Sequence, residues 1–406
     1  MVSKKNSVTS LRIIFFKILT LGTTPILFLL LIEIIIRIWQ PNPLNNHSWI
    51  DDLLIRSGYG ISHAQTSQSS FNTLVAAPEV TNAGFHQYTN SKKSNDHSPL
   101  DFSLKYPPGK KIFSSNFLLM PNQDFISIAK RGDKIIYQAR TRIDSVGRRL
   151  VQQSHTKLRK EFLIFLGCSY IFGEGLDDED TLPWKMAQKI TTRAIYNYGV
   201  PAGSPAIAWK ISKYRKLPTE IKEESGSALY FLWDFHLARL VTRSNWLRVH
   251  PFLIYKPWLS PNSSNDDLID HHLSLKESKQ FKLHIWWGQI SLFNWLGIDW
   301  FPWYRDSDFD FLISALRGIE KNLRKQLSLN KFLVVLPPPF KGESPLISEI
   351  SHRLNQAQIS TLDFSQWKLN QIMTQRPEIE DEGHPSAAFN NFFSDYLAKE
   401  VIKAGI

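Results

Sequence analysis

The sequence predicts an α/β domain with a mainly parallel central sheet over residues 161–406. The first observation is a series of short, almost wholly apolar runs, which are typical of buried parallel strands. The second is that helix-like segments separate these runs. Residues 308–326, for example, carry apolar side chains at helical spacing and should lie on the sheet. The expected strands cover residues 162–167, 194–199, 228–234, 331–337 and 359–364.

Composition limits the class of protein. The chain has 406 residues, 43% of them hydrophobic, so it can bury a large core, and disorder throughout is excluded. Cys168 is the only cysteine, which excludes an intramolecular disulfide and a cysteine-rich zinc site. The net charge of +11 is scattered along the chain. It could favour an anionic membrane or an acidic polysaccharide, but a solvated surface is the more common explanation. No nucleic-acid-binding module is expected.

The N-terminal segment is the most apolar part of the chain. Residues 18–36 form a run of 19 residues with one charge, Glu33, which is about one bilayer thickness of helix. A cleavable signal peptide is the alternative, but its apolar region would be shorter and a small-x-small cleavage site would follow it. We therefore expect an uncleaved transmembrane signal anchor over residues 18–39.

The distribution of basic residues predicts the orientation of this anchor. Four basic residues precede the span. After it, Arg37 is followed by two acidic residues, Asp51 and Asp52, before the next basic residue. By the positive-inside rule, residues 1–17 are cytoplasmic, and the protein is a single-pass membrane protein with its large domain on the extracytoplasmic side.

Three further regions have their own composition. Residues 40–100 are rich in Asn, Ser, Thr and His, and we expect a stalk or loosely ordered segment there. Residues 101–160 contain strand-like runs at 113–120 and 134–143 and predict a small β-rich module. The insert at residues 240–304 is strongly aromatic. It could form a lid or touch the membrane, but packing against the core is favoured.

The sequence GCSYIFG follows the first predicted strand of the sheet and places Ser169 at the carboxyl edge, where α/β folds put their sites. Here the chain resembles the SGNH (GDSL-like) hydrolases, whose first block is Gly-Asp-Ser with a glycine a few residues later. Ser169 occupies the nucleophile position and Gly173 that of the later glycine. Cys168 replaces the usual Asp, which is not a triad member in the family.

The other family blocks follow in order. Gly199, after the second strand, matches the glycine whose amide helps to hold the oxyanion. Asp234 occupies the position where the third block usually has an oxyanion-donating Asn, so the chain departs from the family there. The final Asp-x-x-His block is Asp381 and His384 in DEGHPSAA, just before a C-terminal helix. A carboxylate three residues before the imidazole can orient it toward a serine.

The resemblance implies a flavodoxin-like, three-layer α/β/α domain with Ser169, Asp381 and His384 as the triad and Gly199 and Asp234 near the oxyanion. It implies acyl transfer through an acyl-serine without a cofactor, on an ester-containing substrate such as an acylated glycan or lipid. Water as acceptor gives an esterase, and a sugar hydroxyl gives an O-acyltransferase of exported glycans. A non-catalytic membrane-anchored scaffold is the alternative from another class.

Two other parts of the sequence contain residue types that occur in active sites or metal sites. Cys168 is adjacent to Ser169, but neighbours on an extended backbone point in opposite directions, so a buried apolar role is expected. Asp270, His271 and His272 contain metal-ligating side chains, but no further spaced ligands accompany them. We expect a solvated loop there and no metal site.

Overall fold

The computed structural model describes residues 100–105, 119–153, 159–241, 257–261, 268–274, 304–340 and 344–406. Its centre is a five-stranded sheet in which every neighbouring pair is parallel. When the strands are numbered 1 to 5 along the chain, their spatial order across the sheet is 2-1-3-4-5, which is the flavodoxin-like order. The prediction of an α/β domain with a central parallel sheet is therefore confirmed. The strands are β4 (Glu161–Gly167), β5 (Arg193–Gly199), β6 (Ser225–Phe231), β9 (Leu329–Leu336) and β10 (Thr361–Asp363).

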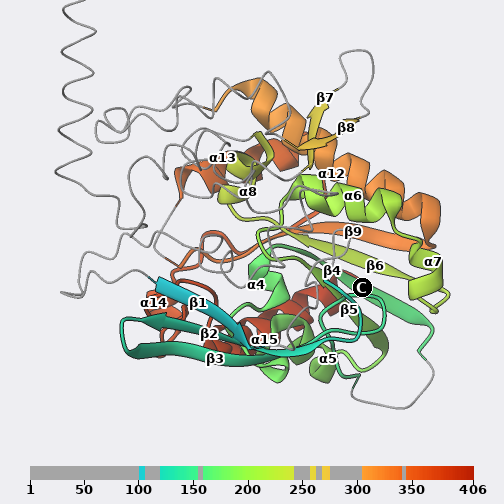
Figure 1. The fold of residues 1–406 in the computed structure, drawn as a ribbon. Coiled ribbons are helices and arrows are strands. Elements are labelled where there is room, and N and C mark those ends of the chain that lie inside the picture. The colour runs from blue at the N-terminus through green and yellow to red at the C-terminus, as the bar shows by residue number, and fades with distance from the viewer. Residues whose placement is uncertain are drawn as a thin grey trace, which may run out of the picture.

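Two layers of helices cover the sheet (Figure 1). Alternate residues of each strand point to opposite faces, so Ile164 and Leu166 of β4 belong to one apolar core and Leu163 and Phe165 to the other. The predicted helix over 308–326 is confirmed as part of the first layer. That layer contains α6 (Pro205–Tyr214), α12 (Asp306–Gln326) and α13 (Pro345–Gln356), and the second contains α5 (Leu182–Lys189) and α15 (Ala387–Lys403).

Shorter elements connect these layers. The helical ones are α4 (Ser169–Phe172), η2 (Asp178–Asp180), α7 (Leu217–Glu220), α8 (Phe235–Val241) and α14 (Leu369–Ile372). Within the insert, β7 (Pro257–Pro261) and β8 (Leu268–Ser274) pair as an antiparallel hairpin. The aromatic run at 285–303 lies outside the described residues, so its role stays a prediction.

A second sheet precedes the parallel one. β1 (Leu100–Lys105), β2 (Asp124–Arg131) and β3 (Lys134–Arg142) form an antiparallel sheet in that order. The strand-like run at 134–143 is confirmed as β3, whereas β2 was missed. β2 and β3 are joined by a two-residue turn in which Gly132 adopts a positive φ of 56°, a conformation that glycine adopts readily.

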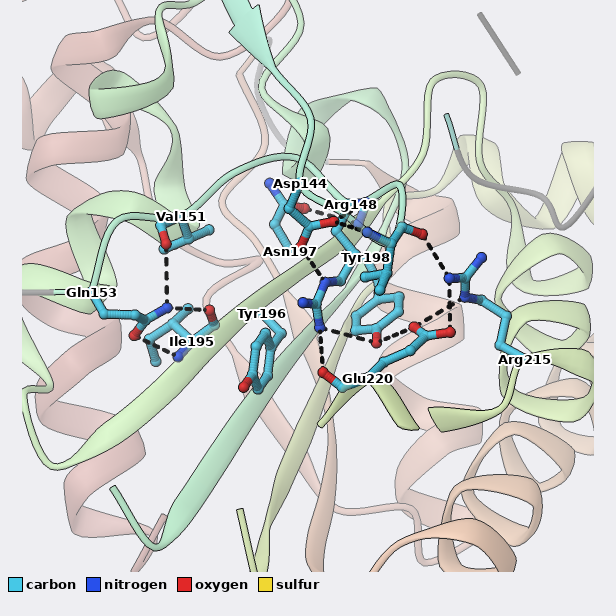
Figure 2. A network of polar contacts seen from close by, with 12 residues as sticks. Asp144, Arg148, Val151, Gln153, Ile195, Tyr196, Asn197, Tyr198, Arg215 and Glu220 are labelled. Carbon is cyan, nitrogen blue, oxygen red and sulfur yellow. Dashed lines mark hydrogen bonds and ion pairs between the residues drawn. The ribbon is translucent and has the colours of Figure 1, made fainter. Parts of the chain in front are cut away.

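Side chains from the segment between β3 and β4 contact β5, which is an edge strand of the sheet (Figure 2). The side-chain amide of Gln153 donates to the carbonyl of Ile195 at 2.8 Å and accepts from its N–H at 3.1 Å, as a neighbouring strand would. Arg148 bonds Asp144 at 2.7 Å and lies 4.3 Å above the ring of Tyr196. This segment therefore covers an edge strand whose backbone would otherwise be exposed.

The N-terminal predictions concern another part of the chain. The expected anchor at 18–39 and the stalk at 40–99 lie outside the described residues. Within the described ranges, no helix combines the length and apolar character that crossing a membrane requires.

Candidate active site

Ser169 stands directly after the carboxyl end of β4. The chain leaves β4 for β5 on one side and continues to β6 on the other, so the strand order reverses at β4. Ligand sites of open α/β sheets form at such a reversal. α4 begins at Ser169, with Cys168 as its extended N-cap residue. The expected position of Ser169 at this edge of the sheet is what the structure shows.

His384 reaches Ser169 from a loop before α15, 215 residues further along the chain. The Nε2 atom of His384 lies 2.8 Å from Oγ of Ser169, and both residues are buried. The ring of Tyr170 packs edge-on against the imidazole with 5.0 Å between centroids, and its hydroxyl donates to the carbonyl of Gly383 at 3.1 Å. The structure therefore brings together the two residues that the sequence placed at the nucleophile and base positions.

The carboxylate partner of His384 is Glu382 and not Asp381. One oxygen of Glu382 is hydrogen-bonded to Nδ1 of His384, and the other accepts the backbone N–H of His384 at 2.9 Å. Glu382 is fully buried. Asp381 instead forms an ion pair with Lys134 at 3.2 Å, and its carbonyl accepts from Arg131 at 2.8 Å. The expected contact between Asp381 and His384 is therefore corrected.

The backbone conformation of this loop explains why Glu382, and not Asp381, contacts His384. Asp381 has a φ of 62° and Gly383 a φ of 96°, so two residues of the loop lie in the left-handed region. The loop closes on itself, since Ile379 donates to the carbonyl of His384 at 2.7 Å and accepts from Gly383 at 3.1 Å. In this tight turn the side chain two positions before His384 folds back onto the ring. The Asp-x-x-His spacing contains no signal for that turn except the glycine.

A second carboxylate, missed in the sequence, approaches the imidazole from the opposite side. Oε2 of Glu174 lies 3.6 Å from Nε2 of His384. Burial lowers the pKa of His384, but the carboxylates of Glu382 and Glu174 outweigh it, so the pKa is raised above 6.5. A raised pKa makes the imidazole a stronger base once it is neutral.

Gly199 is not placed as an oxyanion donor. Its N–H donates to the side-chain oxygen of Asn197 at 2.9 Å, so that hydrogen is already used. The amide nitrogen of Asn197 donates to the carbonyl of Ile171 in α4 at 2.9 Å. A side chain at Gly199 would collide with the backbone of α4, since a Cβ atom would lie 2.4 Å from the nitrogen of Phe172. Gly199 is therefore required for the close approach of β5 to the nucleophile turn.

Asp234 is also engaged elsewhere. One oxygen accepts the backbone N–H of Phe235 at 2.7 Å, and the other accepts the hydroxyl of Ser344 at 2.8 Å. β6 ends at Phe231, three residues earlier than expected, so Asp234 lies in the turn before α8. The expectation that Asp234 stands at an oxyanion position is corrected: it links the loop after β6 to the start of α13.

A buried arginine supports the nucleophile turn. Arg149 donates to the carbonyl of Gly173 at 2.6 Å and to that of Leu176 at 2.6 Å. Its Nε pairs with Asp178 at 2.9 Å, and neither side chain is more than 1% exposed. Gly173 adopts a φ of 85° and donates its N–H to the carbonyl of Ser169. Arg149 thereby satisfies carbonyls where α4 ends, and nothing in its sequence position predicts this role.

The remaining candidates have structural roles in the described residues. Cys168 is fully buried in the apolar core beneath the sheet, and burial raises the pKa of its thiol. It therefore stays protonated and is a poor nucleophile. Asp270 is not in a solvated loop, because its carboxylate contacts the buried ammonium of Lys210 and accepts from Tyr214 at 2.6 Å. Within the described residues, no group of three or more His, Cys, Asp or Glu side chains is arranged so that it could hold a metal ion.

No family model matches the sequence, and no curated protein does. Among solved structures, the chain is similar to a lipolytic protein of the G-D-S-L family from Desulfitobacterium hafniense DCB-2. The identity is 12% and the TM-score 0.31, over 59% of this chain and 99% of that one. It is also similar to an acetyl xylan esterase, Est2A, from the rumen bacterium Butyrivibrio proteoclasticus. There the identity is 10% and the TM-score 0.31, over 74% of this chain and 83% of the other.

Proposed function

We propose that this protein is a serine esterase of the SGNH type, which acts on ester bonds through an acyl-serine. The observation that carries the proposal is the chain of contacts from Ser169 through His384 to the buried carboxylate of Glu382. A serine hydroxyl is a weak nucleophile by itself. A base within hydrogen-bond reach, held by a third group, is the arrangement that activates it.

The steps follow from these contacts. Oγ of Ser169 attacks the ester carbonyl while Nε2 of His384 takes its proton, and Glu382 stabilises the imidazolium that forms. His384 then gives the proton to the departing alkoxide, which leaves as an alcohol. A water molecule attacks the acyl-serine in the same way, and the acid and free Ser169 are released.

Covalent labelling by a fluorophosphonate probe tests this proposal, because it requires an activated serine and no knowledge of the substrate. The wild-type chain should be labelled, and Ser169→Ala should abolish labelling and ester hydrolysis. Cys168→Ser is the matched control: it changes the adjacent buried side chain and should leave labelling largely intact. An unlabelled wild-type protein, or a Ser169→Ala variant labelled at the full rate, would show the assignment to be wrong.

We also propose that residues 18–39 tether the domain to a membrane on its extracytoplasmic side. The support is the apolar run of residues 18–36, with Glu33 as its one charge, and the excess of basic residues before it. Protease treatment of sealed cells should digest the C-terminal domain, and digestion only after lysis would contradict this topology.

A further inference from the structure

Glu174 lies in the loop after α4, on the opposite side of the imidazole from Glu382. Its backbone N–H donates to the carbonyl of Ser169 at 3.0 Å, which fixes the start of its side chain beside the nucleophile. The carboxylate is 3.6 Å from Nε2 of His384, the same nitrogen that contacts Oγ of Ser169. The Glu174 side chain is 14% exposed, so it is mostly shielded from solvent.

We propose that Glu174 is a positioning residue that acts through His384, stabilising the protonated imidazole from its Nε2 side as Glu382 does from its Nδ1 side. This inference rests on the proposed function. When Ser169 attacks, a positive charge develops on the imidazole between two carboxylates. At 3.6 Å and mostly out of water, the second carboxylate interacts strongly with that charge.

At low pH the same contact between Glu174 and His384 should lower the activity. A proton that binds the resting His384 is held by both carboxylates, and Ser169 then has no base. Burial raises the pKa of Glu174, whereas the positive charges nearby lower it, with a net increase. The imidazole and Glu174 therefore titrate as a coupled pair. The charged or titratable groups that act on this pair are Glu382 on the histidine loop, Arg239 on α8, Arg149 before β4 and Tyr137 on β3.

The test is the rate of fluorophosphonate labelling as a function of pH, measured on the full-length chain in detergent or membranes. Glu174→Gln keeps the size of the side chain and removes its charge. The midpoint of the acid limb should fall by about one pH unit. Since proton transfer is partial in the transition state, the variant should be roughly threefold slower at high pH and roughly threefold faster at a pH well below both midpoints. The two curves should cross.

Two variants complete the experiment. Glu179→Gln removes an exposed carboxylate a few residues further on and should leave the curve unchanged. Glu174→Asp keeps the charge at a greater distance and should give an intermediate midpoint. A Glu174→Gln curve that is lowered in parallel at every pH, or that keeps the wild-type midpoint, would overturn the inference while labelling of Ser169 still supports the proposed function. If the wild-type chain is not labelled at all, the proposed function fails and the inference fails with it.

Discussion

Substitution of Asp381 and of Glu382, one at a time, tests which carboxylate supports His384: Glu382, as the structure shows, or Asp381, as the Asp-x-x-His motif predicts. Of these two carboxylates, only that of Glu382 contacts His384, so Glu382→Gln should greatly reduce labelling and ester hydrolysis. The imidazolium loses an opposite charge about 4 Å from its centre. At an effective dielectric of about 20 this is worth about 4 kcal/mol, or roughly a thousandfold in rate. A Gln amide that donates to Nδ1 would also favour the wrong tautomer, a change that costs about 10⁴-fold in serine proteases.

Asp381→Asn is the matched control. Asn tolerates the left-handed conformation that Asp381 adopts, so the turn should survive. Among the described residues, the ion pair lost is with Lys134, whose side chain is 58% exposed, and such surface pairs contribute about 0–1 kcal/mol. The assay is the initial rate on a small activated ester, with thermal unfolding measured in parallel. A severe loss in Asp381→Asn together with an active Glu382→Gln would refute the assignment of Glu382.

Two further predictions concern carboxylates outside the triad. Asp234→Asn should change the labelling rate by less than about threefold, because Asp234 bonds Ser344 and not the nucleophile. A variant that is labelled at least about tenfold faster would show that Asp234 does lie at the oxyanion site. Asp178→Asn should lower the free energy of unfolding by about 3–5 kcal/mol, because it leaves Arg149 buried without its counter-charge. Denaturant unfolding measures this change, and a loss of less than about 1 kcal/mol would contradict the prediction.

The fold was predictable because its signals are local. Each central strand of the sheet is buried on both faces, so β4 and β9 appear in the sequence as continuous apolar runs. Ser169 was found for the same reason, since it directly follows such a run. His384 was found from its motif and its place before the C-terminal helix. The end of β6 was predicted three residues late, because Leu232 and Trp233 continue the apolar run after the strand ends at Phe231.

The acid and the oxyanion glycine were mispredicted because their contacts depend on other parts of the chain. Asp381 and Glu382 are both carboxylates within reach of an imidazole. The choice between them depends on a backbone turn and on Arg131 and Lys134, which lie about 250 residues earlier. Similarly, the N–H of Gly199 matches the family pattern, but Asn197 competes for it from two residues away.

The β2–β3 hairpin, expected to belong to a separate module, contacts both loops that carry the proposed triad. On the nucleophile side, the backbone of Arg140 donates to Asp177 at 2.7 Å. On the histidine side, Ile379 packs against the apolar side chains of the hairpin, beside the ion pair of Lys134 with Asp381. A hydrogen bond between Ser169 and His384 requires two loops, distant in sequence, to keep their spacing within a fraction of an ångström. One hairpin that contacts both loops supplies this constraint, so we infer that residues 124–142 form one functional unit with the proposed triad.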